Sequence, residues 1–396
     1  MTGPLEGIRV LDLSWVLAGP FCTMILNDLG AEVLKLERPN VGDLARGNGP
    51  FINGESSYFT SMNRGKKSIT VDLQKPEGKD IFFKLVKQVD VIVENFVPGT
   101  VKRLGIDYDT VKEVNPRIVY ASISGFGQTG PHSNFRALDV IVQAMGGIMS
   151  ITGEKDGPPL KVGASVGDIT AGLFTTIGIL SAIHEREKSG QGQAIDISMV
   201  DCQMAILENA FMRYFATGAI PERLGTRHPV FTPFQAFQTK DSYIVVAMVG
   251  GTRNQWPLFC AITGHLELMD DPRYETGADR TEHYDELEPI FTEIMKSKTT
   301  DEWIKELSDV GIPCGPINNI AQVAASPQTA HRNMIVEVPH KEGTIKLINT
   351  PVKLSRTPGK VTRTAPELGE NTFEVLNELL GMDEKELQKL NEAGTI

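Results

Sequence analysis

Short apolar runs alternate with helical patterns along the first third of the chain, and this alternation constrains the fold more than any other feature. The runs are rich in β-branched and aliphatic residues, and they cover residues 8–13, 31–37, 68–73, 91–95 and 118–124. Between them, apolar residues recur at helical spacing, for example over 75–90. Strands that alternate with helices pair in parallel and are covered on both faces. The pattern therefore predicts an α/β fold with a Rossmann-like, doubly wound parallel sheet.

The remainder of the chain is divided by a segment rich in Gly, Pro and basic residues, 223–233. Before it we expect a glycine-rich stretch over 125–167, helices over 169–187 and 199–217, and a strand over 194–198. After it we expect a hairpin over 234–248 and three helices, the last of which begins with a capping box of Thr299 and Glu302. These features predict a large domain over 1–222, a smaller α+β domain over 223–325 and a C-terminal segment over 326–396.

Composition excludes several classes of protein. A formal net charge of −11 argues against a nucleic-acid-binding protein, whose affinity depends on clustered Lys and Arg. Apolar runs are too short for a membrane span, and the first one carries charges, which is untypical of a signal peptide. The cysteines, at positions 22, 202, 260 and 314, lack the spacing of a metal site. We therefore expect a reduced cytoplasmic protein that binds neither membrane nor metal.

The first strand and helix invite the interpretation of a dinucleotide-binding fold. That fingerprint needs G-x-G-x-x-G between strand and helix, so that the backbone can approach the pyrophosphate. Here the corresponding turn contains only Gly19, and Pro20 follows it. The missing glycines argue against NAD or FAD and hence against a redox enzyme.

Asp168 is the first candidate for chemistry. It lies in GDITAG, directly ahead of the predicted long apolar helix, where Asp commonly serves as an N-cap. The same position allows a second interpretation, because the positive end of a helix dipole keeps a carboxylate ionised. With small neighbours such as Gly163 and Gly167, an ionised carboxylate could attack a thioester as a covalent nucleophile. The pattern alone leaves both interpretations open.

A second set of candidates follows the predicted strands, at the sheet edge where open α/β folds bind ligands. Its members are Trp15, Val16, Arg38, Asn95 and Phe96. Arg38 and the later Arg103 have the guanidinium groups that hold phosphates bidentately. Asp139 is either another helix cap or a second carboxylate that positions an attacking group.

Long ordered stretches spread over almost the whole chain resemble the class III CoA-transferase family, which includes formyl-CoA transferase and carnitine CoA-transferase. They are LDLSWVLAGPFCTMILNDLGAEVLKLERPNVGD, NRGKKSITVDLQKPEGK, VIVENFVPG, SGFGQTGP, GDITAG, KSGQGQ and GIPCGPINN. The resemblance implies ring-shaped subunits that interlock as a homodimer, or pair with a homologous chain. It also implies that both chain ends build the large domain, so that residues 326–396 return to it.

The resemblance also implies roles for individual residues. Asp168 matches the nucleophilic aspartate, Asp139 matches a residue that assists turnover and is a glutamate in the formyl-CoA enzymes, and Tyr58 matches an active-site tyrosine. The positions that match CoA-binding residues are Arg38, Leu73, Gln74, Asn95, Phe96, Val97, Arg103 and Arg136. The implied substrates are an acyl-CoA and a carboxylic acid. The implied intermediates on Asp168 are first a mixed anhydride with the acyl group and then a thioester with CoA. No metal or redox cofactor is implied.

Two departures from the family bear on the substrate. Leu17 replaces a glutamine of the formyl-CoA enzymes, and their run of four flap glycines is absent. Gly225–His228 or Gly250–Gly251 could take the place of that flap. The two departures argue against formyl-CoA:oxalate activity. Residues 225–246 look closer to members that handle succinyl-CoA and dicarboxylates such as glutarate.

Two alternative functions remain from the sequence. An α-methylacyl-CoA racemase shares the fold but needs an acid/base pair at the α-carbon, with a histidine just before the acid at 139. Leu138 occupies that position and cannot titrate, so transferase is favoured over racemase. The other alternative is a non-catalytic CoA-binding subunit, which the presence of Asp168 disfavours.

Overall fold

The computed structural model describes residues 3–249 and 255–396, and these form two compact units. Unit 1 comprises Met1–Ile148, Lys161–Gly218 and Pro327–Ile396, and unit 2 comprises Met149–Leu160 and Ala219–Ser326. The C-terminal segment thus lies with the N-terminal part in unit 1. Residues 149–160, which the sequence places in the large domain, instead lie with unit 2, where the Leu160 N–H donates to Thr152 O at 3.0 Å.

Unit 1 is built on a six-stranded sheet whose strands are all parallel. The strands are β1 (Arg9–Asp12), β2 (Glu32–Glu37), β5 (Lys67–Thr70), β6 (Val91–Glu94), β7 (Val119–Ser124) and β8 (Ala194–Ser198). Their order is β5-β2-β1-β6-β7-β8, so the sheet grows outward in both directions from β1 and β6. This confirms the predicted doubly wound α/β fold, and the strand order reverses between β1 and β6.

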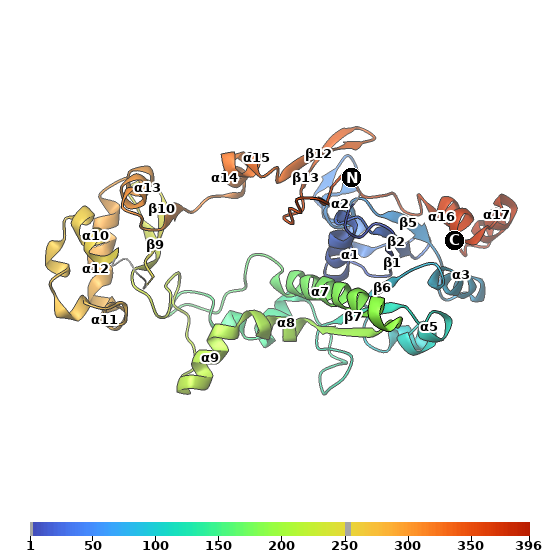
Figure 1. The fold of residues 1–396 in the computed structure, drawn as a ribbon, viewed down its shortest axis with the longest axis horizontal. Helices are drawn as coiled ribbons and strands as arrows, with labels where there is room; N and C mark the ends of the chain where they lie inside the picture. Colours follow the sequence, from blue (N-terminus) through green and yellow to red (C-terminus); the bar gives the residue numbers. More distant parts are fainter. Residues whose placement is uncertain (1–2, 250–254) are drawn as a thin grey trace. The chain divides into compact units, whose positions relative to one another are not determined.

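Side chains alternate between the two faces of this sheet, as the strand period of two requires. Leu11 and Leu34 join one buried cluster with helices α3 (Pro76–Val86), α5 (Tyr108–Val114), α16 (Thr372–Leu380) and α17 (Glu384–Glu392). Val10 and Val33 join the opposite cluster with helices α1 (Ala18–Asp28), α7 (Val166–Ser189) and α8 (Met199–Ile206). Figure 1 shows α1 and α7 on one side of the strands and α3 and α16 on the other.

The other elements of unit 1 are short. They are η1 (Leu44–Gly47), β3 (Phe51–Ile52), β4 (Glu55–Ser56), α2 (Ser57–Asn63), α4 (Thr100–Leu104), α6 (Asp139–Met145), α9 (Glu208–Thr217), α15 (Pro327–His331), β12 (Ile335–His340) and β13 (Gly343–Ile348). The 3-10 turn η2 (Ile148–Ser150) follows α6 as the chain leaves unit 1.

Unit 2 packs helices against a three-stranded antiparallel sheet of order β11-β10-β9. Its elements are β9 (Phe234–Gln238), β10 (Tyr243–Ala247), α10 (Gln255–Thr263), η3 (Leu266–Leu268), η4 (Pro272–Tyr274), α11 (Gly277–Glu282), α12 (Tyr284–Lys296), α13 (Thr300–Asp309), β11 (Cys314–Pro316) and α14 (Ile320–Ala325). The predicted hairpin is confirmed as β9 and β10. The predicted capping box is confirmed at the start of α13, where Thr299 and Glu302 bond reciprocally.

One prediction of local structure was wrong. The helix expected over 199–217 is two helices, α8 and α9, which meet at Leu207. The glycine-rich stretch 125–167 contains helix α6, which begins at Asp139. The apolar face of α6 is short, with Val142 buried, so its helical period is hard to see among the glycines.

Helix α7 is long and apolar enough to cross a membrane by length and composition, although a core helix passes the same test. It lies against α1 and against strands β7 and β8, and Ala171, Ile179 and Ala182 are buried in the core there. The approach to α1 is close, since a Cβ at Gly172 would lie 2.8 Å from Ala18 O. These contacts are those of a core helix in unit 1.

Candidate functional site

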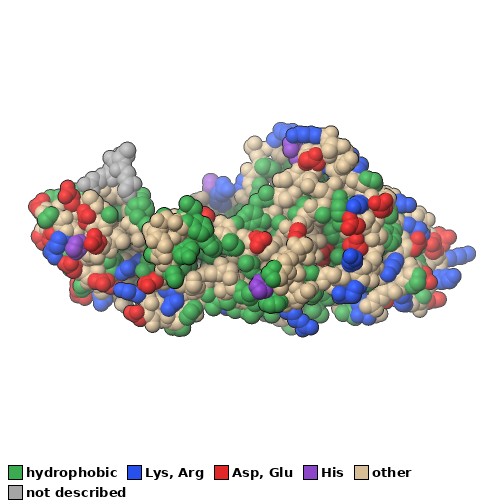
Figure 2. All heavy atoms as spheres, turned by 90° about the horizontal axis from the view of Figure 1, so that it is seen from below, with side chains coloured by type: hydrophobic (Ala, Val, Ile, Leu, Met, Phe, Trp, Pro, Cys, Tyr) green, Lys and Arg blue, Asp and Glu red, His purple; other side chains and the backbone are tan. Residues whose placement is uncertain are grey.

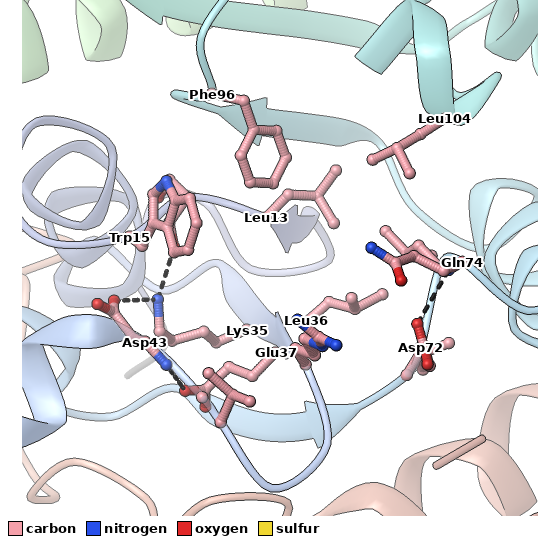
Figure 3. A pocket seen from close by; sticks show the side chains of 16 residues that line it. Leu13, Trp15, Lys35, Leu36, Glu37, Asp43, Asp72, Gln74, Phe96 and Leu104 are labelled. Atoms are coloured by element: carbon pink, nitrogen blue, oxygen red, sulfur yellow. Dashed lines mark hydrogen bonds and ion pairs between the residues drawn. The ribbon is translucent and has the colours of Figure 1, made fainter. Parts of the chain in front are cut away.

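A pocket of about 240 Å³ opens at the carboxyl edge of the sheet in unit 1. The segments that follow β1, β2, β5 and β6 supply its walls, at the point where the strand order reverses. Figure 3 shows Trp15, Phe96, Leu13 and Leu104 around one side, with Gln74 across from them. Open α/β sheets bind ligands at this place. The sequence prediction of a ligand site at this edge therefore coincides with a real cavity.

The segment Trp15–Val16 is held rigidly at the pocket. The Asn95 side-chain amide accepts from Trp15 N at 3.0 Å and donates to Trp15 O at 2.8 Å. The Trp15 ring packs edge-on against Phe96, with 5.5 Å between ring centroids. Val16 has a φ of 66°, a region that β-branched residues seldom adopt, and its N–H donates to Asp43 Oδ1 at 3.0 Å. Such strained backbone is concentrated at functional sites.

A buried ion pair supports this segment from below. Lys35 Nζ lies 2.9 Å from Asp43 Oδ2 and donates to Ser14 O at 2.7 Å, and both side chains are almost completely buried. Burial by itself lowers the pKa of Lys35. The charges of the neighbouring acids outweigh this effect, so the pKa of Lys35 is raised. Sequence reasoning missed Asp43. The available signal was Lys35, a cation inside an apolar strand, which requires a buried partner.

The predicted CoA-binding residues fall into three groups. Arg38, Leu73, Gln74 and Phe96 line the pocket, and the Arg38 side chain is exposed there. Val16 and Asn95 hold the wall formed by Trp15. The remaining predicted residues, Val97, Arg103 and Arg136, are exposed and lie outside the pocket lining.

Asp139 is the first residue of α6, and its carboxylate connects α6 with α7. Oδ1 accepts from Gly167 N at 2.8 Å, and Oδ2 accepts from Gln143 Nε2 at 2.8 Å. Asp139 therefore caps the first turn of α7 from a neighbouring helix. A Cβ at position 167 would lie 3.1 Å from Asp139 Oδ1, which accounts for the glycine ahead of Asp168.

Asp168 is in the first turn of α7, as the third residue of the helix. The prediction that it precedes the helix as an N-cap was wrong, because the cap position belongs to Ser165. The sequence also predicted that the helix dipole keeps this carboxylate ionised, and burial opposes that effect. Burial, and then the charge of Asp139, raise the pKa of Asp168 to about 7. Among the described residues, no donor bonds to its carboxylate, so desolvation outweighs the dipole.

Tyr58, on α2, lies within the electrostatic reach of both carboxylates. Its pKa is raised to about 12 by burial and then by the charges of Asp168, Asp43 and Asp139. Asp43, one of the acids that raise this pKa, also lines the pocket, whereas Tyr58 itself is not among the lining residues. The predicted catalytic residues Asp168 and Asp139 and the predicted Tyr58 are thus brought together in unit 1.

Other positions singled out in the sequence are placed as follows. Leu17 is buried at the start of α1, and the Leu138 side chain is 73% exposed beside Asp139. Gly225–His228 lies in unit 2, where Thr226 Oγ1 accepts from Ala236 N at 3.1 Å. Gly250–Gly251, the other candidate for a flap, lies outside the described residues. Within the described ranges, no group of three or more His, Cys, Asp or Glu side chains could hold a metal ion.

The fold and this geometry define an α/β protein of the doubly wound class, with a pocket at the carboxyl edge of its sheet and a pair of carboxylates at the start of α7. A family model of CoA-transferase family III matches residues 5–372. The chain belongs to that family and is a CoA-transferase.

Similar proteins agree with this assignment. Acetyl-CoA:oxalate CoA-transferase of Acetobacter aceti is 42% identical, over 89% of this chain and 89% of its own length. Succinyl-CoA:glutarate CoA-transferase of Mus musculus is 40% identical, over 99% of this chain and 90% of its own length. The crystal structure of a CAIB/BAIF family protein from Brucella suis has a TM-score of 0.85 and 37% identity, and the match covers 96% of this chain and all of that one.

Proposed function

We propose that this CoA-transferase moves CoA from a short acyl-CoA, with succinyl-CoA as the first candidate, to a dicarboxylate through covalent intermediates on Asp168. The observation that carries the proposal is the Asp168 carboxylate, partly buried in the first turn of α7 with no bonded donor among the described residues and with a pKa of about 7. Support for the substrate class comes from relatives named for succinyl-CoA:glutarate, succinate–glutarate and succinyl-CoA:mesaconate transfer.

The proposed reaction has four acyl transfers, all of them at carbonyl carbon. An Asp168 oxygen attacks the donor thioester, and the C–S bond breaks to give a mixed anhydride and CoA thiolate. The thiolate attacks the aspartyl carbonyl, and the donor acid leaves as a carboxylate, so that Asp168 carries CoA as a thioester. The acceptor carboxylate attacks this thioester and releases the thiolate, which then attacks the acceptor acyl carbon and frees Asp168. Each step conserves the activation of the thioester.

The local environment suits Asp168 to this role. A pKa near 7 leaves a substantial carboxylate fraction at neutral pH while making that carboxylate more basic, and hence more nucleophilic, than an exposed aspartate. Exclusion of water protects the anhydride and the thioester from hydrolysis. Because all four steps are acyl transfers, we propose that no metal or redox group takes part. Arg38, exposed at the pocket rim, is placed to meet a CoA phosphate.

Trapping of the intermediates tests this proposal. The protein is incubated with succinyl-, acetyl- or formyl-CoA and then with hydroxylamine, and Asp168 is examined by mass spectrometry for a hydroxamate. Asp168→Ala should form no adduct and transfer no CoA, while Asp80→Ala, which changes an exposed acid on α3, should behave as wild type. The mechanism is wrong if no donor gives an adduct and Asp168→Ala still transfers CoA. The donor that reacts fastest identifies the acyl group.

We also propose that a second copy of the chain covers the apolar surface of unit 1. Helix α9 has no buried residue although it carries Phe211, Tyr214 and Phe215, and Phe215 is 68% exposed. Further apolar side chains are exposed on α7 and α8, including Ile177 and Met204, and hydrophobic patches are visible on the face drawn in Figure 2. Exposed apolar surface of this kind marks a protein interface.

Analytical ultracentrifugation tests this assembly. The wild type should sediment as a dimer at micromolar concentration, and Ile177→Glu should shift it toward the monomer. A wild-type monomer would contradict the homodimer and would leave pairing with a homologous chain as the remaining assembly.

A further inference from the structure

Gln143 is a buried glutamine on α6, and both the oxygen and the nitrogen of its side-chain amide form hydrogen bonds. It has no exposed surface. Its Oε1 accepts from Val162 N at 2.8 Å, and its Nε2 donates to Asp139 Oδ2 at 2.8 Å and lies 3.4 Å from Ala164 O. A buried side-chain amide with donor and acceptor both engaged holds two chain segments in a fixed relation. The segments here are the first turn of α6 and the loop that leads into α7.

These contacts continue to the residue before Asp168. Asp139, held through Oδ2 by Gln143, accepts from Gly167 N through Oδ1 at 2.8 Å. Gln143 is thus linked to the start of α7 by two sets of hydrogen bonds. One passes through Asp139 to Gly167 N, and the other joins Gln143 to Val162, in the loop just before α7. Both Asp139 oxygens accept hydrogen bonds, so the carboxylate is held at both of its ends.

We propose that Gln143 is a positioning residue of the transfer reaction, which fixes the Asp139 side chain and the first turn of α7 so that the Asp168 carboxylate meets the thioester. The inference rests on the proposed role of Asp168 as nucleophile. No assignment of a role to Gln143 follows from its sequence position alone. The available signal was its spacing of four residues from Asp139, which places both on one face of a helix.

Two substitutions distinguish the contribution of the Gln143 donor, Nε2, from that of its acceptor, Oε1. Gln143→Met has a similar volume but removes both, so Val162 N–H and Asp139 each lose a partner. Gln143→Glu keeps an oxygen for Val162 N–H and replaces the donor to Asp139 by a second carboxyl group. Two carboxyl groups at this distance share one proton. In the protonated pair the hydrogen bond to Asp139 is restored, and in the doubly ionised pair it becomes a repulsion.

The charged groups that bear on this pair are few. Asp139 lies on the same helix, Asp168 lies on α7, and Tyr58 lies on α2, within the electrostatic reach of both carboxylates. Helix α8, which also packs on α6, brings Gln203 next to Gly146, and Gln203 carries no charge. Loss of the shared proton in Gln143→Glu is therefore expected to act on Asp139 and, through Gly167, on Asp168.

The experiment measures kcat and the KM for acyl-CoA against pH for wild type, Gln143→Met and Gln143→Glu. We expect kcat of Gln143→Met to fall about 10- to 100-fold at every pH, while KM changes less than about twofold because the pocket is formed by other segments. For Gln143→Glu, the ratio of wild-type to variant kcat should be near one at about pH 6 and should exceed about ten at about pH 8.5. A purely structural role would lower the amount of folded enzyme without this dependence on pH.

Gln203→Met is the matched control. Gln203 is likewise a fully buried glutamine that packs against α6, but neither of its amide atoms has a hydrogen-bond partner among the described residues. This variant should keep the wild-type kcat and pH profile. The inference is overturned if wild type shows transfer that depends on Asp168 while both Gln143 variants match Gln203→Met. If wild type shows no such transfer, the proposed function itself fails, and the two failures are thus distinguished.

Discussion

Replacement of Asp168 by asparagine is expected to stabilise the folded protein at alkaline pH. The pKa of Asp168 is raised from 3.8 to about 7, first by burial and then by Asp139. Because the folded pKa is the higher one, the unfolded chain ionises first, and the wild type loses stability as pH rises from about 4 to about 7. This difference in pKa corresponds to roughly 4 kcal/mol as an upper limit. Asparagine does not titrate and escapes the loss.

The measured gain should be smaller than this limit. Asparagine must also be desolvated, and water reaches part of the side chain, so we expect about 1–3 kcal/mol at about pH 8.5. For a chain of this length, that gain corresponds to an increase in Tm of about 1–4 °C. At about pH 5 the gain should be clearly smaller. Differential scanning calorimetry of wild type and variant at both pH values gives the comparison, and the variant should be inactive at both.

Asp139→Asn provides a control of opposite sign. Its new amide group would face the Gln143 amide donor, so the hydrogen bond at Oδ2 is lost and the fold should be destabilised by about 1–3 kcal/mol. The reasoning about Asp168 is refuted if Asp168→Asn lowers Tm at about pH 8.5, or if its effect is the same at both pH values.

Three further predictions concern activity. Asn95→Leu removes both hydrogen bonds to the Trp15 backbone and should raise the KM for acyl-CoA about tenfold, with little change in kcat. An unchanged KM would contradict the role of the Trp15–Val16 segment in binding. The single-turnover rate of adduct formation on Asp168 should rise with pH and level off above about 7, since the proposed nucleophile is the carboxylate form. A flat profile would exclude this titration. Gly167→Ala would place a Cβ 3.1 Å from Asp139 Oδ1, so kcat should fall about tenfold or more in steady-state assays, and wild-type kcat would show that this contact is unimportant.

The doubly wound sheet could be predicted from the sequence because its cause is local. Apolar strands such as 91–95 carry the period and length of buried parallel strands in every few residues, and the intervening helices show their own spacing. The family could be predicted for a similar reason, since long ordered motifs are spread over nearly the whole chain. Local periodicity did not reveal the break at Leu207 between α8 and α9, nor the short helix α6 among glycines.

The state of the site could not be predicted in this way. The sequence indicated a capping aspartate kept ionised by a helix dipole, but the fold buries Asp168 beside Asp139, and desolvation outweighs the dipole. The pairing of Lys35 with Asp43 and the strained Val16 above it likewise depend on which segments meet at the carboxyl edge.

The sequence by itself thus determined the elements of the sheet, the family and the identity of the candidate nucleophile. Only the tertiary structure decided the surroundings of Asp168, where Asp139 accepts from Gln143 Nε2 and from Gly167 N, and where burial and Asp139 raise the pKa of Asp168. The physical reason is that hydrogen-bond distance and desolvation depend on groups that are remote along the chain, from α6 to α7, whereas helical and strand periods are set by neighbours in sequence.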